Sequence, residues 1–132
     1  MTIPENTHAL IIEDDTPSIA VLANLFRQLR ITYTAVFDPA KAVSTALSLP
    51  AVNVIFVDLQ LPGSDGYQVL HELRQQTQLG NVPIVAYTSH LSEMSRARQM
   101  GFHSFFGKPI RSSTFQHDLA SVLGGTSVWV NR

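Results

Sequence analysis

Short apolar segments alternate with longer amphipathic segments along the chain, and this alternation limits the fold more than any other feature of the sequence. Five short segments have the composition of β-strands, at residues 9–12, 31–36, 52–57, 82–87 and 104–106. After each of them, apolar residues recur at the spacing of an α-helix. Strict alternation of strand and helix favours right-handed crossovers, so that the strands are parallel and helices cover both faces of the sheet.

The strands differ in how their apolar residues are arranged, and this predicts their positions in the sheet. The first, third and fourth are apolar runs, as strands buried on both faces require. The second alternates apolar with polar residues and the fifth is very short, so both suit sheet edges. We therefore predict an α/β fold: a three-layer α/β/α sandwich whose five-stranded parallel sheet has the second and fifth strands at its edges.

Helix-start signals follow three of the strands. Thr16 is the expected N-cap of the first helix, with Pro17 at the first helical position, where a missing N–H costs nothing. Asp38 with Pro39 starts the second helix, and the third follows Asp65 and Gly66. The residues expected to face the core are Ile19, Leu22, Ala23, Phe26, Leu29, Ala40, Val43, Leu47, Val69, Leu70, Leu73, Leu91, Met94, Ala97, Met100, Phe115, Leu119, Val122 and Leu123.

Length and composition predict one globular domain. The chain has 132 residues, of which 45% are hydrophobic and 14% charged, with a net charge of -1. We assign residues 1–124 to the domain and leave residues 125–132 as a C-terminal tail of unknown role. Trp129 in this tail either docks on the domain or belongs to the start of a linker, and the sequence leaves both open.

Several classes of function are disfavoured. The chain has no cysteine, which excludes disulfides, thiolate nucleophiles and Cys-ligated metals. Its nine Lys and Arg residues form no basic run, so we expect protein partners and no direct contact with nucleic acid. No apolar run approaches the ~20 residues of a membrane helix and no signal peptide is evident, so we expect a cytoplasmic protein without membrane insertion.

Charged and polar residues stand at the carboxyl ends of the predicted strands. Glu13 and Asp14 follow the first strand, Asp58 the third, Thr88 the fourth and Lys108 the last. In an open parallel sheet, these strand ends form the edge at which ligands bind. Three carboxylates in one cleft raise each other's pKa unless they share a cation, and such oxygen ligands suit Mg²⁺. The sequence thus predicts a divalent-metal site beside Asp58.

Four motifs carry a resemblance to a known family. They are EDD after the first strand, VIFVDLQLPGSDG around Asp58, PIVAYTS around Thr88, and FFGKP around Lys108. In this order and spacing, over nearly the whole chain, they resemble the receiver domain of response regulators. The resemblance implies a flavodoxin-like (βα)5 fold with the strand order 2-1-3-4-5. It also implies a phosphorylation-dependent signalling switch of a two-component system or phosphorelay.

The resemblance also implies roles for the acidic residues. Asp58 is then the phosphoacceptor, and Mg²⁺ or Mn²⁺ is held by Asp58, by Asp14 directly, by Glu13 through water, and by the backbone carbonyl of Gln60. A carboxylate can accept a phosphoryl group as an acyl phosphate if nearby positive charge neutralises the phosphoryl oxygens. Three residues are expected to shape the loop after Asp58: Pro62, Gly63 and Gly66.

Further roles follow from the same resemblance. Thr88 binds a phosphoryl oxygen in the active state, and Lys108, next to a cis Pro109, pairs with the Asp58 carboxylate or its phosphate. Phe105 either swings inward as a switch aromatic or is ordinary core. Gln60 and His90 flank the phosphorylation pocket.

The implied partners are proteins. A sensor histidine kinase or a histidine phosphotransfer protein donates the phosphoryl group, and a downstream target reads the face of the fourth helix, fifth strand and fifth helix. The domain itself catalyses phosphotransfer and its own dephosphorylation, so it is a switch and not a conventional enzyme.

Each residue also has a plain structural interpretation. Asp15 does no more than begin a helix, and Ser89 fits a helix cap. The other histidines, at positions 8, 71, 103 and 117, have no metal-ligand spacing and fit the surface. Alone, Asp58 would be a turn residue, and only its neighbours favour a chemical role.

Alternative functions remain open. A flavodoxin-like cofactor binder needs a phosphate cradle after the first strand, where EDD would repel phosphate. An aspartyl phosphatase needs a second acid two residues after the nucleophile, where Gln60 stands. A constitutive interaction module, or a receiver cut from a larger regulator or hybrid kinase, also fits the sequence.

Overall fold

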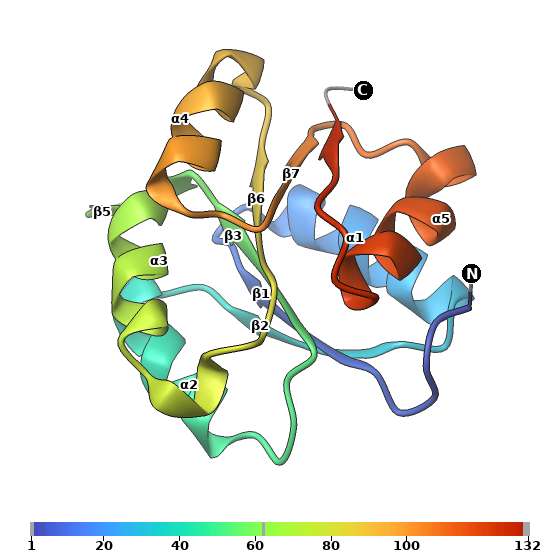
Figure 1. Cartoon of the computed structure of the whole chain (residues 1–132), viewed down its shortest axis with the longest axis horizontal. Helices are drawn as coiled ribbons and strands as arrows, with labels where there is room; N and C mark the ends of the chain where they lie inside the picture. The colour runs from blue at the N-terminus through green and yellow to red at the C-terminus, as the bar shows by residue number, and fades with distance from the viewer. Residues whose placement is uncertain (1, 62, 131–132) are drawn as a thin grey trace.

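A parallel sheet lies between two layers of helices in the computed structural model, which describes residues 2–61 and 63–130 (Figure 1). Its strands run in the order β2-β1-β3-β6-β7-β8. Their bounds are β1 His8–Ile12, β2 Thr32–Val36, β3 Val54–Asp58, β6 Ile84–Thr88, β7 Ser104–Gly107 and β8 Trp129–Val130. The predicted α/β/α fold is confirmed, and the predicted order 2-1-3-4-5 corresponds to the first five of these strands.

The sheet has one strand more than predicted, because the C-terminal tail returns to it. Helix α5 ends before Gly124, and Gly125 has a φ of 95°, which favours glycine. β8 then pairs in parallel with β7, with Phe105 beside Trp129, and Phe105 N donates a hydrogen bond to Val128 O at 2.8 Å. Trp129 therefore docks on the domain.

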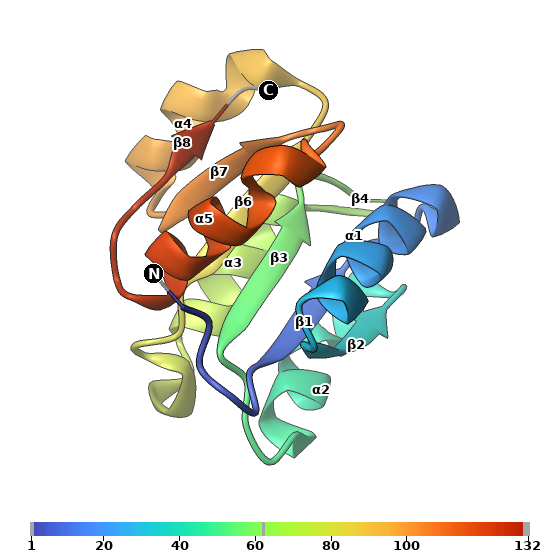
Figure 2. The same ribbon diagram turned by 90° about the vertical axis from the view of Figure 1, so that its right-hand side faces the viewer.

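Helices cover both faces of the sheet (Figures 1 and 2). On one side lie α1 Thr16–Gln28 and α5 Ser112–Leu123. On the other lie α2 Ala42–Ser48, α3 Gly66–Arg74 and α4 Met94–Met100. Short 3₁₀ turns are η1 Pro39–Lys41, η2 Thr77–Leu79 and η3 Leu91–Glu93, and β4 Gln60–Leu61 pairs with β5 Ser64–Asp65 in a separate antiparallel pair.

The helix starts differ in detail from those expected. Asp15, and not Thr16, is the N-cap of α1: its Oδ2 accepts a hydrogen bond from Ser18 N at 3.0 Å. A carboxylate suits the positive end of the helix dipole. Asp38 caps the 3₁₀ turn η1 instead of α2, whereas Asp65 caps α3, which begins at Gly66.

The expected core residues are mostly buried, with four exceptions that are exposed: Ala40, Leu47, Leu91 and Met100. The turn η1 has three residues per turn and precedes α2, so it shifts the inward face of α2 to Ala42 and Ala46. Leu91 lies in η3, before α4 begins, and Ala97 is the buried residue of that helix.

Side chains alternate between two hydrophobic layers along the central strands β1, β3 and β6. Leu10 and Ile12 face the side of α2, α3 and α4, while Ala9 and Ile11 face α1 and α5. Phe105 and Phe106 divide in the same way. β8 continues the pattern, since Trp129 packs with the Phe105 layer, whereas Val128 and Val130 pack with the Phe106 layer. This two-sided packing makes β8 part of the sandwich.

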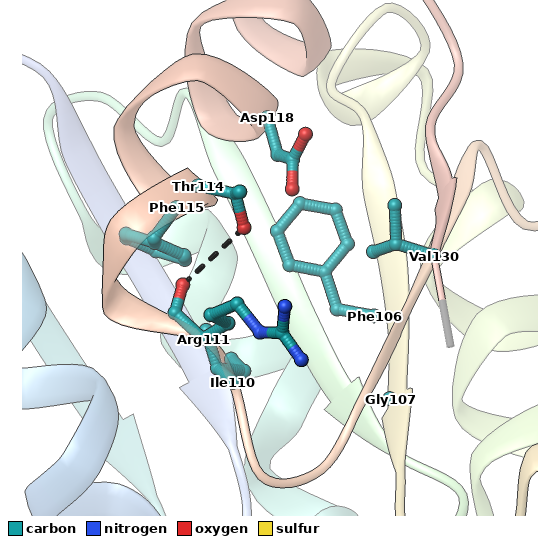
Figure 3. Close-up of a pocket in the computed structure, with 8 residues that line it drawn as sticks. All are labelled: Phe106, Gly107, Ile110, Arg111, Thr114, Phe115, Asp118 and Val130. Atoms are coloured by element: carbon teal, nitrogen blue, oxygen red, sulfur yellow. Dashed lines mark hydrogen bonds between the residues drawn. The ribbon is translucent and has the colours of Figure 1, made fainter. Parts of the chain in front are cut away.

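A small cavity lies between α5 and the β7–β8 edge (Figure 3). The ring of Phe106 borders it, and Val130 of β8 forms one wall. The carboxylate of Asp118 and the guanidinium of Arg111 lie at its sides. Its volume of about 10 Å³ holds at most one water, so it is no ligand site.

No helix among residues 2–61 and 63–130 combines the length and apolar character needed to cross a membrane.

Candidate functional site

The predicted site residues meet at one edge of the sheet. Because the strands are parallel, their carboxyl ends lie together, which brings Glu13 and Asp14 after β1 next to Asp58 at the end of β3. Carboxylate oxygens of these three residues all lie within 4.8 Å of one another. Glu13 and Asp58 are buried, whereas Asp14 is exposed and opens the group to solvent. Hard oxygen donors grouped in this way suit a divalent cation such as Mg²⁺.

Lys108 enters the same cluster from the segment after β7. Its Nζ donates a hydrogen bond to Glu13 Oε1 at 2.6 Å and lies 3.6 Å from Asp58 Oδ2. Only 18% of the Lys108 side chain is exposed, so the charge is held largely away from water. The ammonium lies within ion-pair distance of Asp58, but Glu13 is its nearest carboxylate.

The environment of Glu13 favours its protonated form. Burial raises the pKa of Glu13, and the hydrogen bond with Asp58 raises it further, while Lys108 lowers it. The result is a pKa of about 7, against an ordinary value of 4.5. Because ionisation of Glu13 costs this much free energy, its carboxylate is a strong candidate to bind a cation.

Gln60 links Asp58 to Thr88. The backbone N–H of Gln60 donates to Asp58 Oδ1 at 3.0 Å, and its side-chain Oε1 accepts from Thr88 Oγ1 at 3.1 Å. Thr88 Oγ1 in turn accepts from the backbone N–H of His90 at 3.1 Å. The hydroxyl of Thr88 thus lies at the end of β6 with its proton committed to Gln60.

Comparison with known proteins identifies the family. The family model described as the response regulator receiver domain matches residues 9–120. The chain belongs to this family. A two-component response regulator from Oryza sativa subsp. indica is 30% identical over 118 residues, which cover 88% of this chain and 80% of that protein. The match and the acidic pocket support a phosphoacceptor receiver and do not favour a constitutive interaction module.

Solved structures agree with the family match. A putative response regulator from Chloroflexus aurantiacus has the same fold, with a TM-score of 0.83 and 20% identity over 91% of this chain and 99% of that one. The receiver domain of a sensor histidine kinase from Pseudomonas aeruginosa has a TM-score of 0.81 and 28% identity over 90% of this chain and 98% of that one. That structure has a magnesium ion coordinated in its active-site cleft.

The loop after Asp58 in this receiver domain needs glycine at position 66. A Cβ on Gly66 would lie 2.7 Å from Asp58 O and 2.9 Å from Leu59 Cα, both backbone atoms that cannot move aside cheaply. Gly63 has a φ of 69°, which also favours glycine. The third predicted loop residue, Pro62, lies outside the described residues.

Phe105, Pro109 and His90 complete the predicted set in the receiver. Phe105 is fully buried in β7 and packs in the same layer as Trp129. The Lys108–Pro109 peptide is cis, as predicted. His90 is exposed and precedes η3. The switch role of Phe105 and the pocket role of His90 stay predictions.

Two residues near Lys108 were not anticipated from the sequence. Ser18 Oγ accepts a hydrogen bond from Lys108 Nζ at 3.2 Å, and Nζ lies 4.3 Å from the ring centroid of Tyr87. The Tyr87 hydroxyl donates to Ser18 O at 3.0 Å. The sequence contains one indication of this contact: Tyr87 lies in a strand buried on both faces, where its hydroxyl needs a hydrogen-bond partner.

Proposed function

We propose that this receiver domain is a phosphorylation-dependent switch in which Asp58 accepts a phosphoryl group. The observation that carries the proposal is the placement of the buried Asp58 carboxylate, 3.6 Å from Lys108 Nζ and grouped with oxygens of Glu13 and Asp14. Oδ1 of Asp58 accepts a hydrogen bond from the Gln60 backbone. We therefore assign the nucleophile to Oδ2, the oxygen that faces Lys108.

In the proposed reaction, Oδ2 of Asp58 forms a bond to phosphorus while the bond from phosphorus to the donor breaks. With a phosphohistidine donor, the imidazole nitrogen leaves with the bonding electron pair and takes a proton from solvent. The product on Asp58 is an acyl phosphate, with no oxidation or reduction. The domain contributes position and charge, so it acts as a switch with self-catalysed phosphotransfer and autodephosphorylation.

Glu13, Asp14, Asp58 and the backbone carbonyl of Gln60 are the groups that would hold Mg²⁺ or Mn²⁺. When bound, such a cation supplies positive charge that offsets the charge of the phosphoryl oxygens. Asp14 is exposed and can take its place as a ligand without loss of core packing. Glu13 must first lose its proton, because its pKa is raised to about 7.

Thr88 and Lys108 are assigned to the phosphoryl oxygens. Lys108 already points its ammonium toward Asp58, and phosphorylation brings additional negative charge to that position. Thr88 must exchange its hydrogen bond to Gln60 for one to a phosphoryl oxygen. This exchange costs little free energy, because the neutral hydrogen bond from Thr88 to Gln60 is replaced by a hydrogen bond to the charged phosphoryl group.

The donor is assigned to the histidine kinase or histidine phosphotransfer class. A groove of about 250 Å³ runs beside Lys108 and Pro109, with Pro17 and Val21 of α1 in its wall. Val21 is 44% exposed, although it is apolar. An apolar surface beside the reacting carboxylate supports docking of a protein donor here. A cytoplasmic location stays a prediction from the sequence.

The output face is assigned to α4, β7, α5 and the strand β8 that lies on β7. β7 connects the site to this face: Gly107 pairs with Thr88, and Phe105 pairs with Trp129. The guanidinium of Arg98 on α4 lies 4.6 Å from the ring centroid of Trp129. A shift of Thr88 and Phe105 on phosphorylation would therefore reach the surface through Trp129, as a change in the populations of two conformations.

Beryllofluoride with Mg²⁺ tests this proposal, because it mimics an acyl phosphate on a carboxylate. We expect it to shift backbone NMR signals around Thr88, Phe105 and Trp129 in the wild type and to leave Asp58→Ala unchanged. Glu72→Ala, a substitution at an acidic residue of α3 outside the site, is the control and should respond like the wild type. Equal responses of wild type and Asp58→Ala would contradict the proposal.

A further inference from the structure

We propose that Ser18 and Tyr87 are positioning residues that hold the Lys108 ammonium toward Asp58. The inference rests on the proposed function, in which Lys108 neutralises charge on the phosphoryl group. Neither residue belongs to the acidic cluster, and neither is one of the groups assigned to the phosphoryl oxygens or the cation. Both act through Lys108, and three contacts carry the argument.

The first contact is between the ammonium and the face of the Tyr87 ring. Nζ of Lys108 lies 4.3 Å from the ring centroid, within the range of a cation–π interaction. The ring itself is fixed, because Tyr87 is buried and packs edge-on against Phe56 at 6.2 Å and 89°. Such interactions gain strength when the cation is largely shielded from water, as Lys108 is.

The second contact is between Lys108 and the Ser18 hydroxyl, and its direction is determined by Asp15. Ser18 Oγ lies 2.6 Å from Asp15 Oδ2, which can only accept when it is ionised, so the single hydroxyl proton goes to Asp15. The hydroxyl oxygen is then left as an acceptor toward Lys108 Nζ at 3.2 Å. Asp15 therefore orients the serine, and the serine orients the ammonium.

The third contact joins the two positioning residues. The hydroxyl of Tyr87 in β6 donates to the backbone O of Ser18 in the first turn of α1, at 3.0 Å. The residues lie 69 positions apart in the sequence, so this bond ties the start of α1 to the end of β6. This bond fixes the distance between the face of the Tyr87 ring and the Ser18 hydroxyl. The Lys108 ammonium contacts both of these groups.

The donor count of Lys108 shows what these contacts achieve. An ammonium has three N–H groups, and Glu13 and Ser18 accept two of them. When two of the three N–H directions are fixed, the direction of the third is fixed as well. Its partner is then Asp58 Oδ2, the other carboxylate oxygen paired with Lys108, at 3.6 Å. Loss of Ser18 Oγ would free the ammonium to rotate, and its charge would lie less often against the phosphoryl group.

Phosphorylation by acetyl phosphate with Mg²⁺ tests the inference, measured against donor concentration to separate the maximal rate from the half-saturating concentration. We expect Ser18→Ala to lower the maximal rate about three- to tenfold, the size expected for one hydrogen bond, with little change in half-saturation. Ser18→Thr keeps the hydroxyl and should restore most of the rate. Ser44→Ala, which removes an exposed serine hydroxyl from α2, is the matched control.

Tyrosine variants separate the ring from the hydroxyl. Tyr87→Phe keeps the cation–π contact and loses only the bond to Ser18, so its rate should fall less than that of Tyr87→Leu, which loses both. The decisive comparison repeats Ser18→Ala and Tyr87→Phe in a Lys108→Met background. Residues that act through Lys108 have no further effect there, whereas an equal fold-loss in both backgrounds would overturn the inference.

A separate readout distinguishes this inference from the proposed function. If the wild type takes up no phosphate, the proposed function fails, and the positioning contacts are then judged from urea unfolding of Ser18→Ala, Lys108→Met and the double variant. Non-additive changes in the midpoint support the contact, and additive ones overturn it. If the wild type is phosphorylated and Ser18→Ala matches its rate, the function stands and the positioning role is wrong.

Discussion

Lys108 lies closer to Glu13 than to Asp58: its Nζ is 2.6 Å from Glu13 Oε1 and 3.6 Å from Asp58 Oδ2. The ammonium therefore serves two carboxylates at once. Its interaction with Asp58 strengthens whenever Glu13 has another partner, whether a proton or a cation. The acidic cluster and the lysine thus form one charge-coupled unit. A proton or cation that binds Glu13 alters the interaction between Lys108 and the phosphoacceptor Asp58.

The raised pKa of Glu13 makes stability depend on pH. The folded state binds the proton more tightly than the unfolded chain, so the stabilising contribution is complete below pH 4.5 and is lost as pH rises toward about 7. The free energy of unfolding of wild type, relative to Glu13→Gln, should fall over this window by at most about 1.4 kcal/mol per pH unit. Urea unfolding between pH 4.5 and 7.5 measures the difference, and parallel curves would show that Glu13 titrates normally.

Gln60 should restrain the switch, because its Oε1 holds the Thr88 hydroxyl proton at 3.1 Å. In Gln60→Ala this hydroxyl is free to turn toward a phosphoryl oxygen. We expect beryllofluoride with Mg²⁺ to bind about threefold more tightly, a little under one hydrogen bond in free energy. The same substitution in a Thr88→Val background should have no effect on affinity. Weaker binding by Gln60→Ala would mean that the amide helps to hold the phosphoryl group.

His90 should protect the acyl phosphate from water. It is exposed, and its backbone bonds to Thr88, so it follows the site directly. We expect His90→Ala to lose phosphate severalfold faster after donor removal, with its stability changed by no more than ~0.5 kcal/mol. His71→Ala on the exposed side of α3 is the control. Identical time courses for His90→Ala and wild type would show that the His90 side chain does not shield the acyl phosphate and is an ordinary surface residue.

Trp129 should stabilise the domain, because it joins β8 to the layer that contains Phe105 and Ala97. Trp129 is half-buried, so Trp129→Ala should lower the free energy of unfolding by about 1–3 kcal/mol, below the range for fully buried aromatics. Arg98→Ala removes only the cation–π partner and should cost about 0.5–1 kcal/mol. Urea unfolding followed by circular dichroism compares the two. No loss on Trp129→Ala would mean that β8 is not docked in solution.

Much of the fold was predictable because its signals are local. Apolar runs at residues 9–12 and 82–87 identify strands buried on both faces, and strict alternation with helices determines the topology. The strand ends then identify the site, since Asp58 and Lys108 must meet wherever the carboxyl ends of parallel strands meet. These inferences need no knowledge of tertiary contacts.

The predictions are wrong where tertiary contacts, or a small rotation of a helix about its axis, determine the structure. The tail gives no strand signal, because β8 has only two residues and forms by pairing with β7. The turn η1 rotates the inward face of α2, a change that a fixed helical period cannot predict. Ser18 and Tyr87 were missed because their contact spans 69 positions of sequence.

The phosphoacceptor assignment is tested most directly by intact-protein mass spectrometry after incubation with acetyl phosphate and Mg²⁺. Wild type should gain the mass of one phosphoryl group, and alkaline hydroxylamine should remove it, as expected of an acyl phosphate. Asp58→Asn keeps the size and much of the hydrogen bonding of the side chain and should gain nothing, and chelation of the metal should abolish the gain in wild type. A comparable, hydroxylamine-sensitive mass gain in Asp58→Asn would contradict the account.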